Sequence, residues 1–410
     1  MYIKRAIEQH LAGQFASAKA LAVTGARQVG KTTLTSHLFP EIRRINMKDS
    51  RLLNAATEDP RAFLDGFGRP LFIDEVQNAT FLLDDIKVIL DEIRTKKNYL
   101  FSGSQKWSLM KGLSESLAGT VSLLELTTLS LRELYQAGCH LPFSLHDEYL
   151  AEREKKLVPY ENIWGHIHKG FYPELYDDAP REWGVFYRDY VSTYIEKDVY
   201  DILKVRDQRT FYRFLVSVAA RTASVLNYSN IADDIGIDSE TVKSWVSVLE
   251  NTGIVYLLHP YFSSHLSRAV KTPKIYFRDT GLAAYLTNWN STEQLRDGAM
   301  SGAFFETFVV NEILKSYINA GKDYTNHLFY YRGKDKRKSE NEIDFIIEEN
   351  NVLYPVEIKK NSNPGADMAA AFPVLDKQLD KRRGRGAIIC MTEHKLQLRE
   401  NLVALPVSYI

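Results

Sequence analysis

The chain has 410 residues, of which 45% are hydrophobic and 25% are charged. This composition excludes an intrinsically disordered chain and leaves room for two or three folded domains. Lys plus Arg and Asp plus Glu both number 52, so no net charge attracts nucleic acid, and any affinity for DNA must come from local basic clusters. No apolar run is long enough to span a membrane and no signal-peptide core is present, so we expect a cytoplasmic protein without membrane contacts.

Residues 1–135 are predicted to form an α/β domain. The N-terminus is expected to be a short amphipathic helix with Ile3, Ile7 and Leu11 on one side. Beyond it, apolar runs alternate with helical stretches, and such runs are typical of a parallel sheet that is buried on both faces. The expected strands are residues 19–25, 42–47, 70–75, 98–104 and 120–126, and a helix is expected over residues 82–96.

A phosphate-binding P-loop pattern, Gly25-x-x-x-x-Gly30-Lys31-Thr32, lies between the first strand and a helix. The glycines let the backbone turn tightly, so that successive N–H groups point at phosphate oxygens, and the helix N-terminus adds its dipole. We expect Lys31 to reach the β- and γ-phosphates of ATP and the Thr32 hydroxyl to bind Mg²⁺. The predicted nucleotide-binding residues are Gly25, Ala26, Arg27, Gln28, Val29, Gly30, Lys31, Thr32 and Thr33.

The third and fourth expected strands end in polar residues at the same edge of the sheet. Asp74 and Glu75 end the third strand, and we predict that Asp74 serves Mg²⁺ while Glu75 is the catalytic base that prepares water. The alternative for this pair is an acidic strand end that caps the next helix. The fourth strand leads to Ser104, which we predict to contact the γ-phosphate, with Gln105 as second choice and a solvated turn as the alternative.

Arg132 and Glu133 close this region. An arginine at this position can bridge subunits or steady the nucleotide, but a surface salt bridge is the more common arrangement of such a pair. We therefore expect a surface salt bridge here.

Residues 136–295 are expected to be mostly helical, with helices over residues 190–203 and 211–220. Within residues 205–290, the pattern is a helix, a turn at Gly236, a second helix capped by Ser239, and a strand. This order is typical of a winged helix-turn-helix.

The second helix of that motif, residues 239–251, carries one lysine and two glutamates. This charge pattern is poor for phosphate contact, so a lid or protein-contact role is slightly favoured over DNA reading.

Residues 296–410 return to an α/β pattern. Helices are expected over residues 303–320 and 369–381, and strands over residues 328–332, 342–349, 353–360 and 386–393.

Asp344, Glu357 and Lys359 fall on consecutive apolar strands, where charged residues need a specific reason. Glu357 and Lys359 share one strand face, and Asp344 joins them if the two strands pair. Two carboxylates placed in this way bind Mg²⁺, the lysine positions or activates water, and Glu306 on the preceding helix can supply a third oxygen. We therefore predict a nuclease-like site with Asp344, Glu357 and Lys359 as catalytic residues and Glu306, Asp344 and Glu357 as metal ligands.

This arrangement resembles the PD-(D/E)xK nucleases, whose core has the same order of a helix and three strands. The alternative is an inactive relic of that fold. Two basic clusters nearby can hold phosphate backbones or be solvated loops, namely Arg332, Lys334, Lys336, Arg337 and Lys338, and Lys381, Arg382, Arg383 and Arg385.

Nearly end to end, the chain resembles a family of archaeal and bacterial P-loop ATPases that join an AAA-type ATPase domain to a C-terminal domain of uncharacterised function. The resemblance is carried by ordered blocks that include GARQVGKTTL (25–34), LFIDEVQ (71–77), FSGSQ (101–105), KIYFRDTGL (274–282), GAFFETFVVNEILK (302–315), EIDFIIE (342–348) and VEIKK (356–360). It implies ATP binding, an AAA-like core, a winged helix and a restriction-endonuclease-like C-terminal fold. Where the family pattern has an arginine after SLAG, this chain has Thr120, which implies slow hydrolysis or the use of another arginine.

The expected function is a Mg²⁺-dependent ATPase that uses hydrolysis to move its domains, with DNA as a candidate partner. One alternative is a nucleotide-controlled, metal-dependent DNA nuclease. Another is a scaffold that is switched by ATP or ADP without turnover and binds a protein partner. A homo-oligomer is a further expectation, because AAA-type enzymes often place an arginine across a subunit interface.

Overall fold

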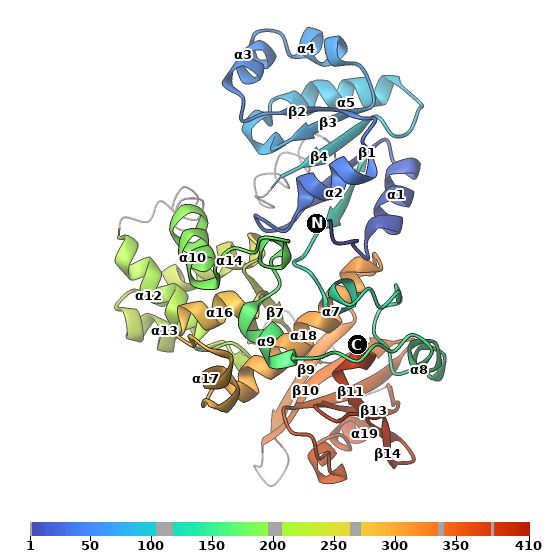
Figure 1. Ribbon diagram of the computed structural model, residues 1–410, viewed down its shortest axis with the longest axis vertical. Coiled ribbons are helices and arrows are strands. Elements are labelled where there is room, and N and C mark those ends of the chain that lie inside the picture. Colours follow the sequence, from blue (N-terminus) through green and yellow to red (C-terminus); the bar gives the residue numbers. More distant parts are fainter. Residues whose placement is uncertain are drawn as a thin grey trace.

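The computed structural model describes residues 2–103, 117, 119–195, 207–262, 272–334, 340–378 and 381–410. Figure 1 shows three lobes in chain order: an N-terminal lobe at the top, a mostly helical middle lobe at the left, and a C-terminal lobe at the lower right. Two elements, α7 (Leu131–Leu134) and α18 (Ser301–Asn319), lie where the lobes meet (Figure 1).

The N-terminal lobe is built on a parallel sheet with the strand order β2-β3-β4-β1-β5 among the described residues. Each strand lies within its predicted range: β1 (Ala20–Thr24), β2 (Arg43–Asn46), β3 (Leu71–Asp74), β4 (Tyr99–Ser102) and β5 (Val121–Glu125). Every residue of β1, β3 and β4 is buried, as continuous apolar runs predict.

Helices cover this sheet, and one of them differs from the expectation. The described helices are α1 (Glu8–Ser17), α2 (Lys31–Leu38), α3 (Ser50–Glu58), α4 (Pro60–Phe67), η1 (Val76–Ala79) and α5 (Leu82–Glu92). The N-terminal helix begins at Glu8 and not at the first residues, and it buries Leu11 and Phe15 against the core. Residues 2–7 precede the helix, and Tyr2, Ile3 and Arg5 line the nucleotide site described below.

The middle lobe combines helices with a small antiparallel sheet of order β6-β8-β7. Its strands are β6 (Ser224–Val225), β7 (Val255–Leu258) and β8 (Lys274–Phe277). Its helices are α9 (Ile163–Lys169), η2 (Pro173–Tyr176), α10 (Trp183–Tyr190), η3 (Val191–Ile195), α12 (Gln208–Ala219), α13 (Tyr228–Ile235), α14 (Ser239–Asn251), α16 (Thr280–Leu286) and α17 (Thr292–Asp297). Helix α8 (Asp147–Glu154) precedes them in the chain but lies beside the C-terminal lobe (Figure 1).

The predicted helix–turn–helix is present as α13 and α14. Gly236 ends α13 in the left-handed conformation, with φ of 77°, which favours glycine. The cap of α14 is Asp238 and not Ser239, because the Asp238 carboxylate accepts a hydrogen bond from the Thr241 N–H at 2.8 Å. The helix expected over residues 190–203 is described only as far as Ile195. Over Val191–Ile195, η3 continues α10 as a π-helix.

The C-terminal lobe packs α18 against a mixed sheet of order β14-β15-β13-β11-β10-β9, with β12 paired to β11. The strands are β9 (Leu328–Lys334), β10 (Glu340–Glu349), β11 (Val352–Lys359), β12 (Arg382–Arg383), β13 (Gly386–Cys390), β14 (Leu396–Arg399) and β15 (Leu402–Pro406), and η5 (Val407–Tyr409) follows. The last two strands were not predicted from the sequence.

The single helix expected over residues 369–381 is wrong. The structure has η4 (Ala366–Ala369) and α19 (Val374–Gln378) instead. Pro373 lies between them, and a proline disfavours a helical conformation at the residue before it and cannot donate to the preceding turn.

Helix α18 is buried on nearly all sides, which is typical of a helix enclosed by the rest of a protein. The hydrophobic cluster around it includes Leu131, Phe171, Phe308 and Ile389, which come from all three lobes. The core is therefore continuous across the lobes, and a second cluster fills the other face of the N-terminal sheet.

Candidate functional site

The two glycines of the P-loop are needed for different reasons. Gly25 has φ of 137°, and a Cβ at this position would lie 2.1 Å from the carbonyl oxygen of Leu126, so only glycine fits. Gly30 has φ of 92° and directly precedes α2, where the chain must turn into the helix. The loop therefore presents the N-terminus of α2 towards solvent, as an anion site requires.

Lys31 bonds to its own loop. Its ammonium donates to the carbonyl oxygens of Gly25 at 2.9 Å and Ala26 at 2.7 Å. Burial lowers the pKa of Lys31 to about 8, although Glu75 and Asp74 nearby oppose the shift. A bound phosphate group would present anionic oxygens to this ammonium. The ammonium would then exchange its two carbonyl contacts for contacts with the phosphate.

The residues predicted for Mg²⁺ lie together at the edge of the sheet. The Thr32 hydroxyl is 3.1 Å from Oδ2 of Asp74, and the Ser102 hydroxyl at the end of β4 donates to Oδ1 of the same carboxylate. Arg44 of β2 donates to Oδ2 at 2.5 Å. A hydroxyl beside a buried carboxylate is the donor set that Mg²⁺-ATP uses in P-loop proteins, so these residues fit the ion.

Glu75 follows β3 in a left-handed conformation, with φ of 56°, which is uncommon for a residue with a side chain. Its carboxylate accepts from Lys48 at 2.6 Å and from Gln77. Burial by itself raises the pKa of Glu75, but these two hydrogen bonds outweigh burial, so the pKa lies below its usual value. The carboxylate is therefore ionised and held beside the P-loop.

A cavity of about 550 Å³ lies over the P-loop and contains most of the predicted nucleotide-binding residues. Its lining includes Arg27, Gln28, Val29, Gly30, Lys31, Thr32, Thr33, Asp74 and Glu75. The lining also includes residues that the sequence did not indicate: Tyr2, Ile3, Arg5, Lys48, Leu129, Pro173, Glu174, Asp177, Thr193 and Tyr194.

Among the described residues predicted to bind the nucleotide, Gly25 and Ala26 do not line this cavity. Gly25 and Ala26 lie beneath the loop, where Ala26 faces the middle lobe at Gly253. Ser104 and its alternative Gln105 lie outside the described residues. Ser102 of the same predicted strand is described, and its hydroxyl donates to Asp74.

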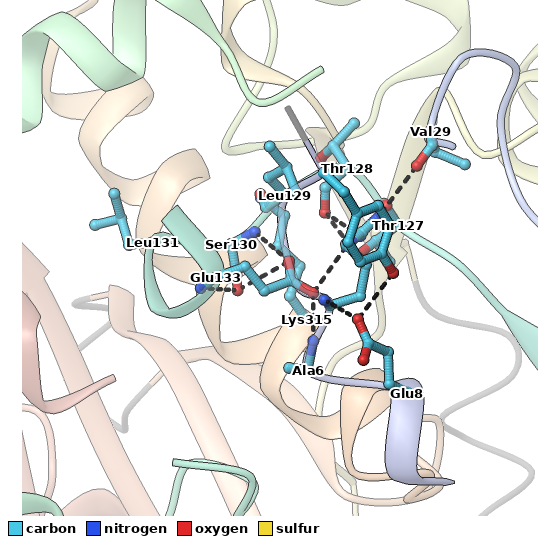
Figure 2. A network of polar contacts seen from close by, with 12 residues as sticks. Ala6, Glu8, Val29, Thr127, Thr128, Leu129, Ser130, Leu131, Glu133 and Lys315 are labelled. Atoms are coloured by element: carbon cyan, nitrogen blue, oxygen red, sulfur yellow. Dashed lines mark hydrogen bonds and ion pairs between the residues drawn. The ribbon is translucent and has the colours of Figure 1, made fainter. Parts of the chain in front are cut away.

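Arg5 ties the P-loop to the rest of the protein and was not found from the sequence. Its guanidinium, which is 4% exposed, donates to the carbonyl oxygens of Val29 at 2.9 Å and Thr127 at 2.7 Å. It also pairs with Glu133 at 2.9 Å. Figure 2 shows Val29, Thr127 and Glu133 brought together at this junction.

The surface salt bridge expected between Arg132 and Glu133 is wrong, because both residues are buried and have other partners. Glu133 forms a capping box with Ser130 and accepts a hydrogen bond from Arg5. Arg132 donates to the carbonyl oxygen of Leu141 at 2.6 Å and to the Tyr149 hydroxyl at 2.5 Å. The short helix α7 turns the two side chains in different directions, which a linear pair of charges does not reveal.

The C-terminal residues predicted as a site are also gathered. Strands β10 and β11 pair antiparallel with Phe345 opposite Val356, which brings Asp344 and Glu357 together. Lys359 lies 3.1 Å from Oδ2 of Asp344 and 2.7 Å from Glu357. Burial and the neighbouring Asp344 raise the pKa of Glu357.

Glu306 enters the same cluster from α18, but its partners come from the middle lobe. It accepts from the Tyr276 hydroxyl at 2.7 Å and from the Lys274 ammonium at 3.1 Å. Across the described residues, no group of three or more His, Cys, Asp or Glu side chains is arranged to hold a metal ion. The metal role of Glu306, Asp344 and Glu357 stays a prediction.

Most of the second basic cluster is neutralised. Lys381 pairs with Glu348, Arg383 with Asp376 at 2.8 Å, and Arg385 with Asp147. The first cluster is described only in part, since Lys336, Arg337 and Lys338 lie outside the described residues.

Comparisons with known proteins match three separate stretches of the chain. Residues 17–135 match the AAA domain family, residues 160–293 match a domain of unknown function (DUF8612), and residues 301–410 match a second domain of unknown function (DUF4143). The curated relatives include the uncharacterized proteins Mb2031c of Mycobacterium bovis and Rv2008c of Mycobacterium tuberculosis. Each is 26% identical over 395 residues, which is 96% of this chain and 81% of the relative.

Solved structures resemble the chain only loosely. The Walker-type ATPase PABY2304 of Pyrococcus abyssi is 14% identical with a TM-score of 0.41, and covers 68% of this chain and 94% of its own. RuvB of Thermotoga maritima, as the T158V variant, is 17% identical with a TM-score of 0.27, and covers 61% of this chain and 88% of its own.

The AAA match and the geometry of the P-loop together support a nucleotide-binding P-loop ATPase domain in the N-terminal part of the chain. Within the described ranges, no helix has the length and apolar character needed to cross a membrane.

Proposed function

We propose that the protein is a Mg²⁺-dependent ATPase that transmits the state of its nucleotide site to the middle and C-terminal lobes. The observation that carries this proposal is the arrangement of Lys31, Thr32, Asp74 and Glu75 around one cavity. Bound Mg²⁺ would supply charge neutralisation for the phosphates. Thr32 and Asp74 would hold the ion, Arg27 and Lys31 would bind phosphate oxygens, and Glu75 would accept a proton from water.

Phosphate release and ATP binding, measured separately, test this proposal. Lys31→Ala is expected to abolish both. It removes the ammonium that donates to two carbonyl oxygens of the loop and that would donate to phosphate oxygens when ATP is bound. Glu75→Gln is expected to retain ATP binding and to lose phosphate release, since the amide cannot accept the proton.

Lys155→Ala is a matched control, because Lys155 is exposed and, among the described residues, its ion pair is with Glu152 of α8. It is expected to leave binding and release unchanged. Unchanged phosphate release by Lys31→Ala would show that the P-loop is not the hydrolytic site.

Communication with the other lobes is supported by buried polar contacts that start at the P-loop. Arg5 joins the Val29 carbonyl to Glu133 of α7, and the Leu131 N–H of α7 donates to Glu312 of α18 at 2.8 Å. The Lys315 ammonium of α18 donates a hydrogen bond to the carbonyl oxygen of Leu129 at 2.7 Å (Figure 2). A shift of the P-loop on nucleotide binding would therefore be passed to α18 through Arg5 and α7.

The α13–α14 module is proposed to be a winged helix that makes protein contacts. Its second helix buries Val242, Trp245, Val246 and Leu249, so these side chains serve packing. The helix before it carries Asp234, which pairs with Arg221. Helices α13 and α14 themselves carry a single basic side chain, Lys243, so DNA reading by these two helices is correspondingly less favoured.

The nuclease alternative has a direct test. If the C-terminal cluster cuts DNA, wild-type protein should nick DNA with Mg²⁺ or Mn²⁺, and Asp344→Ala should remove that activity. No cutting by wild type with either metal would leave the ATPase as the enzymatic function of this chain.

A further inference from the structure

One buried lysine of the middle lobe lies inside the carboxylate cluster of the C-terminal lobe. Lys274 begins β8, its side chain is only 2% exposed, and its ammonium is within ion-pair distance of three carboxylates. The distances are 3.1 Å to Glu306, 2.6 Å to Glu342 and 3.8 Å to Asp344.

Asp344 and Glu357 have further donors in the same cluster. Oδ2 of Asp344 accepts from the Ile358 N–H at 3.0 Å and from the Lys359 ammonium at 3.1 Å. Lys359 also pairs with Glu357 at 2.7 Å. All four carboxylates of the cluster therefore already have a cationic partner.

This arrangement does not fit a divalent cation. Mg²⁺ requires oxygen ligands at about 2.0–2.1 Å, and it would have to enter among Glu306, Asp344 and Glu357. The Lys274 ammonium already lies on Glu306 and Asp344, and the Lys359 ammonium lies on Glu357. Two positive charges at this spacing in a buried site repel each other strongly. The Lys274 side chain is 2% exposed and its carboxylate partners lie on α18 and β10, so its ammonium is held inside the cluster and away from solvent.

We infer that Lys274 is the built-in cation of this cluster and that it excludes divalent metal ions from the site formed by Glu306, Asp344 and Glu357. The inference concerns the C-terminal cluster alone and does not depend on ATP hydrolysis. Failure of the ATPase proposal would leave it unchanged.

The experiment is a titration of the full-length, nucleotide-free protein with Mn²⁺, in which free Mn²⁺ is followed by electron paramagnetic resonance. Wild type and Asp344→Asn are expected to give the same titration, because the cluster does not bind the ion. Lys274→Met is expected to gain one Mn²⁺ site, because a buried positive charge has been removed. The affinity of this site for Mn²⁺ should exceed any Asp344-dependent affinity of wild type by at least about tenfold. Adding Asp344→Asn to Lys274→Met should remove that site.

Lys315→Met is the matched control, because Lys315 is an equally buried lysine of α18 that is paired with Glu312 at 2.9 Å and lies outside the cluster. It should gain no Asp344-dependent site. If Lys274→Met does not fold, Lys274→Gln is measured in its place, because its amide can still donate to Glu306 and Glu342.

Two results would overturn the inference. One is Mn²⁺ binding by wild type that Asp344→Asn removes. The other is a folded Lys274→Met or Lys274→Gln protein without a new Asp344-dependent site.

Discussion

Two ion pairs with buried cations join distant parts of this chain. Arg5 and Glu133 are 4% and 1% exposed and lie 128 positions apart in the sequence. Lys274, whose side chain is 2% exposed, pairs with Glu306, which is 15% exposed, at the junction of two lobes. A buried ion pair is costly to break, because the remaining partner is left as an uncompensated charge.

Removal of Arg5 should therefore destabilise the protein strongly. Arg5→Met leaves Glu133 buried without its cation and frees the carbonyl oxygens of Val29 and Thr127. We expect the free energy of unfolding, measured with urea, to fall by about 3–5 kcal/mol. Arg61→Met, which removes exposed ion pairs, should leave it nearly unchanged, and equal losses in the two variants would contradict the prediction.

His166 makes stability depend on pH. Its ring nitrogens lie 3.0 Å from the Tyr135 hydroxyl and 3.1 Å from the Tyr176 hydroxyl, and burial lowers its pKa from 6.5 to about 4, with a smaller contribution from Lys169. The unfolded chain takes up a proton near pH 6.5 that the folded protein refuses until about pH 4, so stability is lost as the pH falls through this window.

The measurement is urea unfolding at the two ends of that window for wild type and His166→Gln. The His166→Gln variant should lose less stability than wild type between pH 6.5 and about pH 4, because position 166 then has no group that the unfolded chain protonates. A variant whose stability falls as steeply as that of wild type would contradict the assignment to His166.

At the scale of elements, two glycines in the same lobe are expected to respond in opposite ways to alanine. Gly25→Ala places a methyl group 2.1 Å from the Leu126 carbonyl oxygen, so the P-loop cannot keep its path beside β5. Gly13→Ala adds a methyl group within α1 with no atom closer than 4 Å, and should stabilise the helix by about 0.5–1 kcal/mol.

ATP binding and thermal unfolding distinguish the two variants. Gly25→Ala should lose ATP binding, whereas Gly13→Ala should bind ATP as wild type does and unfold at a slightly higher temperature. ATP binding by Gly25→Ala with unchanged affinity would mean that the loop does not need the close approach to β5.

At the scale of the whole molecule, the lobes share one hydrophobic core, and α18 is enclosed by all of them. The C-terminal lobe in isolation would expose the face of α18 that packs on the middle lobe, and it would lose Lys274 from its carboxylate cluster. We therefore expect the fragment of residues 296–410 not to fold by itself.

Circular dichroism and size-exclusion chromatography of two fragments check this expectation. The fragment of residues 140–410 keeps the middle lobe and should give a cooperative thermal transition, whereas residues 296–410 should give none. A cooperative, monomeric 296–410 fragment would show that the shared core is dispensable for this lobe.

Much of the secondary structure was predictable because it is encoded locally. The strands of the N-terminal lobe, the turn at Gly236 and the helix that became α18 each follow from apolar spacing or from one special residue. The single helix predicted over residues 369–381 failed at Pro373, and the salt bridge predicted for Arg132 and Glu133 failed because burial depends on the packing of neighbouring elements.

The sequence by itself determined the P-loop, the carboxylates at the end of β3, and the strands that carry Asp344, Glu357 and Lys359. Only the tertiary structure decided which cations meet these groups: Arg44 on Asp74, Lys48 on Glu75, and Lys274 in the C-terminal cluster. The physical reason is that periodicity along a chain reports which face of an element is buried, whereas the partner of a buried charge comes from another element, whose position depends on how the whole chain packs.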